Sequence, residues 1–134
     1  MIKLVYCLRR RPELSREEFQ AYWRQTHGPL VRQRAAALGI RRYVQVYTLA
    51  SPLNEALAAS RGSAEEPFDG VAELWWESAE SVAAATSTPE GRQAAQELLE
   101  DEKRFIDFAR SVIFVAQEYP VLEGQSPGRR KERA

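Results

Sequence analysis

The chain has 134 residues, an ordinary length for one domain, and its 44% hydrophobic content allows a core without metals or disulfides. Its 19 basic and 19 acidic residues balance, which argues against nucleic-acid and anionic membrane partners, because both select a basic surplus. The single cysteine, Cys7, excludes an intrachain disulfide and a cysteine-based zinc site and fits a reducing compartment, so we expect a cytoplasmic protein without metal or cofactor.

The N-terminal part of the chain predicts a strand followed by a capped helix. Residues 2–8 are rich in β-branched and aromatic side chains and too few to span a membrane, so they predict the first strand. Ser15 and Glu18 have the spacing of a capping box, which predicts a helix that begins there. Because Pro29 removes a backbone donor and crowds the preceding turn, we expect a kink or short break just after His27.

The rest of the chain predicts further strands and helices in alternation. Strands are predicted at residues 40–49, 68–76 and 112–118, a short helix in the polar loop at 52–60, and helices at 78–86 and 88–110. We therefore expect one domain over residues 1–120. Residues 121–134 are polar and basic and predict a flexible tail.

The order of the main elements is β-α-β-β-α-β, which predicts a ferredoxin-like α+β fold. In this fold a four-stranded antiparallel sheet carries both helices on one face. The predicted strands are apolar on both faces, for example with Leu4 and Tyr6 on one side of the first strand and Val5 and Cys7 on the other. A sheet of this kind needs a cover for its second face, and we expect a second copy of the chain to supply it, sheet against sheet.

Two separated motifs carry a resemblance to a known family. They are FxxYWxxxHGPL at residues 19–30 and FDGVAELWW at residues 68–76. In this order they resemble the EthD family of the dimeric α+β barrel superfamily, over roughly residues 1–120. The resemblance implies a homodimer whose two sheets face each other as a barrel, with a pocket between sheet and helices in each subunit. The superfamily holds cofactor-free monooxygenases, cyclases, an isomerase and haem proteins, so the fold leaves the reaction open.

His27, the only histidine, is the candidate catalytic residue. It shares a helix face with Trp23 and Leu30 and precedes Gly28–Pro29, so we expect a half-buried ring at a helix break. Imidazole exchanges protons near neutral pH, and a ring with one nitrogen held and the other free can act as a general base. The alternative is structural: the ring bonds a carbonyl that the break leaves free.

Two carboxylates on the predicted strand 68–76 are also candidates. Asp69 and Glu73 lie four residues apart and so share a face. Because a carboxylate among apolar neighbours is costly to bury alone, Glu73 either acts as a general base in the pocket or pairs with an arginine such as Arg42 across the sheet. Asp69 precedes a glycine and either contacts the ligand or starts the strand.

Aromatic side chains supply the remaining candidates. They either form the core or line a cleft for a flat apolar ligand, which phenol groups would orient. The candidate substrate-binding residues are Trp23, Tyr43, Asp69, Glu73, Trp75 and Tyr6.

These features favour a protein that binds an apolar or aromatic, oxygen-bearing small molecule. The leading interpretation is a cofactor-independent enzyme of catabolism or secondary metabolism, with oxidoreductase, monooxygenase-type or proton-transfer chemistry. The alternative is a non-catalytic binding or accessory protein of a degradation pathway. Haem binding is disfavoured because His27 is the only imidazole and lies beside the expected break.

Overall fold

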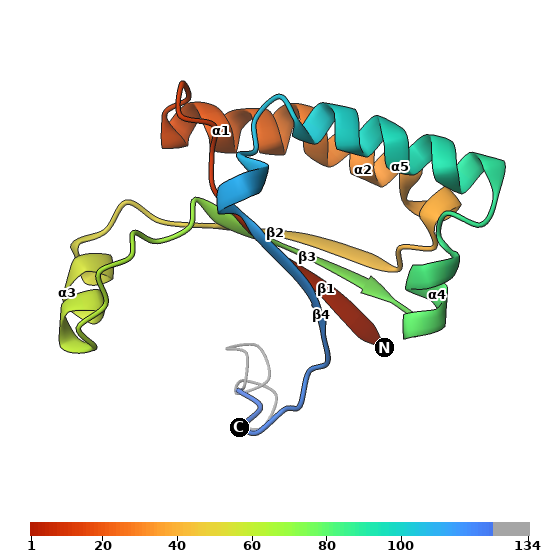
Figure 1. Cartoon of the computed structure of the whole chain (residues 1–134). Helices are drawn as coiled ribbons and strands as arrows, with labels where there is room; N and C mark the ends of the chain where they lie inside the picture. Colours follow the sequence, from red (N-terminus) through yellow and green to blue (C-terminus); the bar gives the residue numbers. More distant parts are fainter. Residues whose placement is uncertain (125–134) are drawn as a thin grey trace, which may run out of the picture.

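The computed structural model describes residues 1–124 and contains one antiparallel sheet in the order β2-β3-β1-β4 (Figure 1). Its strands are β1 (Ile2–Leu8), β2 (Arg42–Tyr47), β3 (Gly70–Trp76) and β4 (Val112–Ala116). The predicted ferredoxin-like α+β fold is therefore confirmed. All four predicted strands are present, three of them two residues shorter at one or both ends. Most of the predicted tail, residues 125–134, lies outside the described residues.

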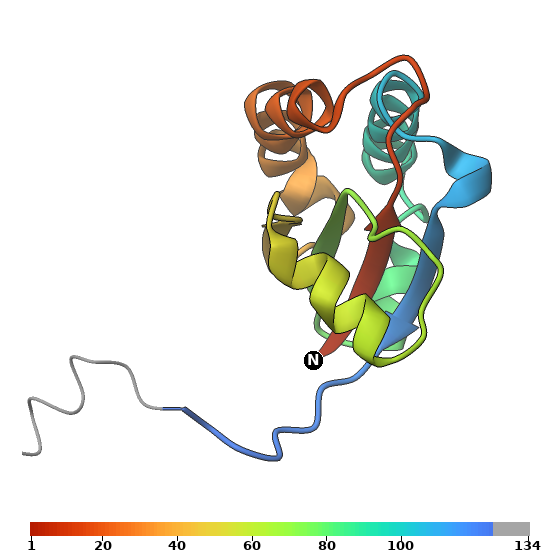
Figure 2. The same ribbon diagram turned by 90° about the vertical axis from the view of Figure 1, so that its left-hand side faces the viewer.

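The helices lie mainly on one face of the sheet, as Figures 1 and 2 show. They are α1 (Arg16–Tyr22), a π-helical turn (Trp23–His27), α2 (Gly28–Leu38), α3 (Pro52–Ser60), α4 (Ala79–Ala84), α5 (Pro89–Glu102) and a 3-10 turn (Phe108–Arg110). The arm formed by α1, the π-helical turn and α2 runs beside α5, whereas α3 stands off one end of the sheet. No helix within residues 1–124 is long and apolar enough to cross a membrane.

The first helical arm begins at its predicted cap but does not break where expected. The Ser15 side chain accepts from the Glu18 backbone and the Glu18 side chain from the Ser15 backbone, so the capping box is complete. Instead of breaking after His27, the helix widens before it, and the N–H of Gly28 bonds to the carbonyl of Trp23. Pro29 then falls in the first turn of α2, where its missing donor costs little.

The last helix is shorter than the predicted range 88–110. Thr88 caps α5 as the sequence suggests, but the helix ends at Glu102. The chain then turns, and Phe105 and Ile106 enter the core beside the end of β1. The N–H of Arg11 bonds to the Phe105 carbonyl at 3.0 Å. The apolar pattern past residue 102 therefore came from a buried turn and not from a continued helical stripe.

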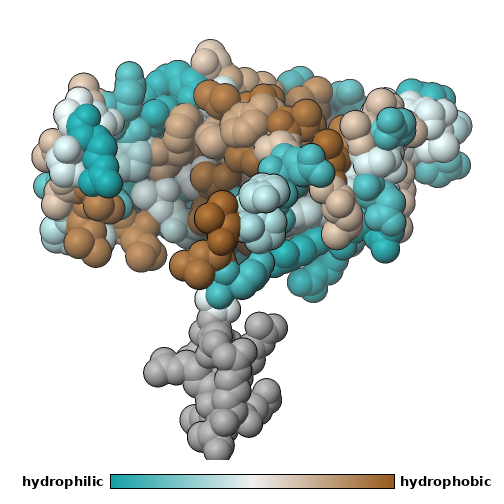
Figure 3. Space-filling view, turned by 90° about the horizontal axis from the view of Figure 1, so that it is seen from below, coloured by the Kyte–Doolittle hydropathy of each residue, from teal (hydrophilic) through white to brown (hydrophobic). Residues whose placement is uncertain are grey.

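The two faces of the sheet have different neighbours. Alternate residues of a strand point to opposite faces, and those packed under the helices are Leu4, Tyr6, Leu8, Tyr43, Gln45, Tyr47, Ala72 and Leu74. The opposite side, here the helix-free face, carries Lys3, Val5, Cys7, Val44, Val46, Val71, Glu73, Trp75, Val112 and Phe114. Figure 3 looks onto the underside of the sheet and shows apolar residues gathered there. Phe114 and Val112 are each 48% exposed and Val46 is 42% exposed, so the two edges of this face present uncovered apolar side chains in the single chain, whereas Trp75 between them is buried.

Candidate functional site

The residues predicted for one site lie in three separate places. Trp23, His27, Tyr6 and Tyr43 lie on the helix side of the sheet. Glu73 and Trp75 belong to the helix-free face, and Asp69 lies just before β3 in a cluster of arginines. The alternation of side chains along β3 is what separates Glu73 and Trp75 from the helix-side residues.

Glu73 and Trp75 belong to a charged and aromatic group on the helix-free face. The Glu73 carboxylate pairs with Lys3 Nζ at 3.0 Å, so Lys3 takes the place of the expected arginine. Arg42 instead lies over the Trp75 ring, 4.6 Å from its centroid, and Lys3 lies 5.1 Å from the same ring. A salt bridge and cation–π contacts of this kind account for both side chains without a small-molecule ligand.

Asp69 is a buried anchor between the end of β1 and α1. It is 3% exposed, and its carboxylate accepts from the Arg10 backbone at 2.8 Å, from Arg10 Nη1 at 2.6 Å and from Arg16 Nε at 3.0 Å. Burial acts to raise the pKa of Asp69, but these hydrogen bonds outweigh it and hold the pKa below its ordinary value. These three hydrogen bonds fix the carboxylate at the start of β3, which fits the strand-start interpretation.

His27 is more deeply buried than the sequence suggested. The residue is 5% exposed, not half-buried, and its ring packs against Phe105 with centroids 5.0 Å apart. Its Nδ1 lies 2.7 Å from Oδ2 of Asp101, in the last turn of α5. Asp101 also accepts from the Tyr22 hydroxyl at 2.5 Å. The ring is thus held by a carboxylate and not by a carbonyl freed at a helix break.

This contact fixes the chemistry of the imidazole. An ionised carboxylate only accepts, so Nδ1 carries the hydrogen and Nε2 keeps a lone pair. Burial lowers the pKa of His27 below 6.5, although its bond to Asp101 acts in the opposite direction, so the ring is neutral at pH 7. Nε2 has no hydrogen-bond partner within residues 1–124. Every fully buried side-chain nitrogen of these residues has a partner, so Nε2 is not fully buried and keeps some accessible surface. The ring can therefore accept a proton at Nε2.

A second carboxyl lies next to this pair. Burial, together with the charge of Asp101, raises the pKa of Glu102 to about 7. The Glu102 carboxylate also acts on two tyrosines of the sheet: burial and its charge raise the pKa of Tyr6 to about 12, and it contributes to a similar value for Tyr43, where burial dominates. The space between α5 and the sheet thus holds an acid that titrates near neutrality beside two phenols that stay protonated.

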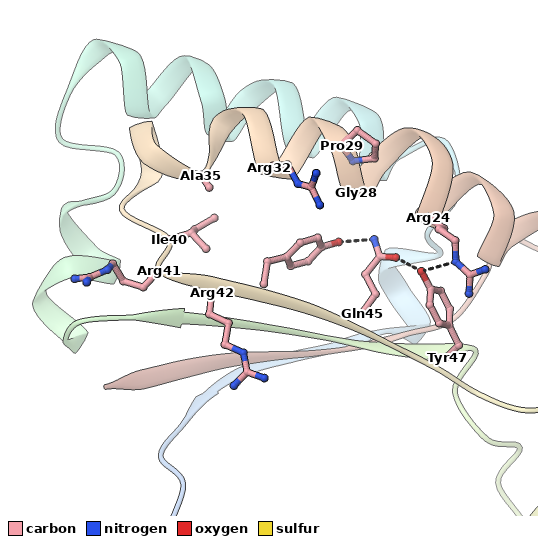
Figure 4. A pocket seen from close by; sticks show the side chains of 11 residues that line it. Arg24, Gly28, Pro29, Arg32, Ala35, Ile40, Arg41, Arg42, Gln45 and Tyr47 are labelled. Atoms are coloured by element: carbon pink, nitrogen blue, oxygen red, sulfur yellow. Dashed lines mark hydrogen bonds between the residues drawn. The ribbon is translucent and has the colours of Figure 1, made fainter. Parts of the chain in front are cut away.

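A pocket of about 490 Å³ opens between α2 and the edge strand β2 (Figure 4). Its lining residues are Arg24, Gly28, Pro29, Arg32, Ala35, Ile40, Arg41, Arg42, Tyr43, Gln45 and Tyr47. Of the residues predicted for the site, Tyr43 lines this pocket. Its ring packs against both core clusters, so Tyr43 connects the pocket with the layer that contains Glu102. No group of three or more His, Cys, Asp or Glu side chains within residues 1–124 could hold a metal ion.

Sequence reasoning missed Asp101, Glu102, Gln45 and Arg32. One signal for Asp101 was present: it lies three residues after Leu98 and seven after Ala94, on the buried stripe of α5. A carboxylate on an apolar stripe requires a buried partner, and the single histidine was available. Arg32 had no comparable signal, because an arginine on a helix is ordinarily solvated.

Comparisons with known proteins identify relatives of this chain. The model of the EthD domain matches residues 11–109. An ethyl tert-butyl ether D (EthD) family protein from Bacillus halodurans shares 24% identity, with 89% of this chain and 99% of that chain covered and a TM-score of 0.58. A dimeric protein of unknown function and ferredoxin-like fold from Bacteroides fragilis shares 11% identity, with 87% and 95% covered and a TM-score of 0.55.

A third similar structure is that of an enzyme variant. SnoaB from Streptomyces nogalater, a cofactor-independent oxygenase, shares 14% identity, with 92% of this chain and 97% of that chain covered and a TM-score of 0.50. No functionally curated protein matches the chain. The similar structures show a shared fold, and the domain match covers most of the chain.

Proposed function

The chain belongs to the EthD domain family, and on that premise we propose that it is a small-molecule-binding, cofactor-independent enzyme. Its substrate is an apolar or aromatic compound that bears oxygen, and its chemistry is proton transfer or the oxygenation of an activated carbon. The observation that carries this proposal is the buried pair His27–Asp101, 2.7 Å apart, in which a neutral imidazole keeps Nε2 free. A shared fold with a cofactor-independent oxygenase supports the same class of chemistry.

In this proposal His27 is the general base and Asp101 orients it. The carboxylate holds the Nδ1 hydrogen and stabilises the imidazolium that forms when Nε2 takes a proton from the substrate. Glu102, whose pKa of about 7 lets it exist in both protonation states, supplies or receives the second proton. Tyr6 donates a hydrogen bond to the oxygen on which negative charge develops.

We further propose that the enzyme is a homodimer formed through the helix-free face. An uncovered apolar sheet face is unusual in a stable monomer, and a second copy would bring an identical apolar face to cover it. The exposed side chains of Val46, on the edge strand β2, and of Val112 and Phe114, on the opposite edge strand β4, would lie in that interface.

Proton transfer can be tested with 2-tetralone, an aromatic ketone with exchangeable protons beside its carbonyl. We expect the wild-type protein to accelerate the exchange of these protons in D2O, measured by NMR, and His27→Asn and Asp101→Asn to lower that rate at least about tenfold. Binding is followed separately through 2-naphthol, using the Cε1–H signal of His27, which needs no assignment because the chain has one histidine.

The two measurements separate the two functions. A shift of the His27 signal on addition of 2-naphthol, without any acceleration of exchange, would favour the non-catalytic binding protein. If 2-naphthol causes no shift of the His27 signal and the protein does not accelerate the exchange, the proposed site is contradicted altogether. The control variant Arg92→Gln changes an exposed arginine of α5 and should leave both measurements unchanged.

A further inference from the structure

The polar row at the base of the α2–β2 pocket has a fixed hydrogen-bond direction. The carbonyl of Trp23 can only accept, so the atom of Gln45 that lies 2.9 Å from it is the nitrogen Nε2. The same nitrogen donates its other hydrogen to the Tyr43 hydroxyl at 2.8 Å. The Tyr47 hydroxyl donates to Oε1 of Gln45 and accepts from Arg24 Nε at 3.2 Å. Each of these groups except Tyr43 therefore has a partner for its hydrogen.

Tyr43 consequently presents a free donor at the pocket. Its hydroxyl oxygen accepts from Gln45, and within residues 1–124 its own hydrogen has no acceptor. Burial raises the pKa of Tyr43 to about 12, so the hydroxyl keeps its hydrogen at neutral pH. A ligand atom that meets this hydroxyl must therefore accept a hydrogen bond.

The charges around the pocket select the same kind of ligand. Four of its lining residues are arginines and none is acidic. Arg41 pairs with Glu77 at 3.2 Å, and Arg42 lies over Trp75 on the helix-free face, so both are engaged elsewhere. Arg32 has no hydrogen bond or ion pair in the described part of the chain, and Figure 4 shows it extending from α2 toward Gln45. One unpaired guanidinium and one unpaired hydroxyl thus converge on the same space.

The remaining walls fit a flat apolar body. Ala35 and Ile40 are apolar, and Gly28 presents bare backbone, where an added Cβ would lie 3.1 Å from Gln45 Nε2. The pocket is therefore apolar along part of its wall, and the guanidinium of Arg32 and the hydroxyl of Tyr43 offer donors to a ligand's polar group. Its volume of about 490 Å³ is within the usual range for small-molecule sites.

We propose that this pocket selects an anionic aromatic ligand, whose carboxylate is bound by the guanidinium of Arg32 and the hydroxyl of Tyr43. The inference rests on the proposed function and names its ligand class: an aromatic acid and not a neutral aromatic. A guanidinium binds a carboxylate through paired charge-assisted hydrogen bonds, which a neutral amide cannot replace.

The experiment is calorimetric titration of the full chain with 2-naphthoate and with its neutral isostere 2-naphthamide. We expect the carboxylate to bind at least about tenfold more tightly than the amide. Arg32→Gln should reduce this preference to about twofold, and Tyr43→Phe should weaken the naphthoate affinity by about threefold or more. The matched control is Arg34→Gln, which removes one positive charge from the same helix at a residue that pairs with Glu97 outside the pocket, and it should keep the preference.

Three results would overturn the inference. They are equal affinities for the two probes, an equal loss in Arg34→Gln and Arg32→Gln, and no saturable naphthoate binding at millimolar concentration. His27→Asn separates this inference from the proposed catalysis, because it should retain the carboxylate preference even if proton transfer is lost. Circular dichroism of each variant confirms that a loss of binding is not a loss of the fold.

Discussion

The imidazole of His27 and the carboxylate of Asp101 meet at 2.7 Å across 74 residues of sequence. The first residue ends the π-helical turn and the second lies in the last turn of α5, so their contact joins the two helical segments above the sheet. Both side chains are buried, and Asp101, which also accepts from the Tyr22 hydroxyl, is the only hydrogen-bond partner of the His27 ring among residues 1–124. The pair is therefore both a structural tie and the centre of the proposed chemistry.

Asp101→Asn should lower the pKa of His27 further. Burial already depresses this pKa, and the carboxylate is what opposes the depression. The Cε1–H chemical shift of the single histidine, followed against pH in wild type and variant, measures the change. In the wild-type protein the folded state binds fewer protons at His27 than the unfolded state does. The contribution of this ring to the free energy of unfolding should therefore be fully present above about pH 6.5 and decrease as the pH falls. An unchanged or higher pKa in the variant would contradict the orientation of the pair.

Glu102→Gln should stabilise the protein at pH 8 by on the order of 2 kcal/mol. The native pKa of about 7 lies above the ordinary 4.5, so the folded state holds its proton longer than the unfolded state does. Wild-type stability should therefore fall as the pH rises from about 4.5 to 7, and the variant should lack this fall. Urea unfolding at pH 5 and pH 8 compares the two proteins. Equal stabilities at pH 8 would show that Glu102 is solvated.

Gly70→Ala should cost about 2–3 kcal/mol of folding free energy through overpacking. An added Cβ would lie 2.4 Å from Cζ3 of Trp23 and 3.0 Å from the carbonyl oxygen of Val46, and neither can move freely. Gly124→Ala is the matched control, because nothing lies within 4 Å of its Cβ position. Thermal unfolding of both variants checks the prediction, and Trp23→Phe combined with Gly70→Ala should recover part of the loss.

Asp69→Asn should destabilise the fold by about 2–3 kcal/mol, because two arginines lose their common anion. The depressed pKa of Asp69 means that its contribution is present above about pH 4 and disappears as the pH falls through the native pKa. Denaturant unfolding between pH 3 and pH 7 measures this. Ligand affinity in the folded variant should stay unchanged. A loss of affinity without a loss of the fold would show that Asp69 belongs to the binding site.

Phe114→Asp should convert the expected dimer into a monomer at micromolar concentration. The substitution places a charge on the β4 edge of the helix-free face, which a paired copy would bury. Sedimentation equilibrium gives the mass directly. Phe108→Asp, at a similarly exposed phenylalanine outside this face, should leave the mass of the wild type, and a wild-type protein with the mass of one chain would refute the dimer.

Local patterns predicted most of the fold. The capping box at Ser15, the proline after Thr88 and the alternation in β2 each act over a few residues, and each marked its element correctly. The end of α5 was missed because Phe105 and Ile106 satisfy a helical period while the tertiary core fixes them in a turn. Helical periodicity reports burial, and burial can continue after the helix has ended.

The residues of the site were harder to predict from the sequence than the elements of the fold. The helix-side position of Tyr43 follows from strand alternation once the register is known, but register depends on contacts between distant strands. The partners of His27 and Glu73 come from other elements, 74 and 70 residues away. Spacing within one strand or helix could not identify Asp101 or Lys3, because only the packing of the whole chain places them.

The π-helical turn also resolves a mismatch of periods along the first helical arm. The buried residues Phe19, Trp23, His27 and Val31 recur every four positions, whereas an α-helix completes a turn in 3.6. Each step of four therefore overshoots by about 40°, and three steps would carry Val31 far around the helix axis from Phe19. A wider turn in the middle takes back part of this drift. Deleting one residue of the turn would leave eleven steps of about 100° between Phe19 and Val31, about 20° from three full turns, so a continuous α-helix would then keep both halves of the arm facing the sheet.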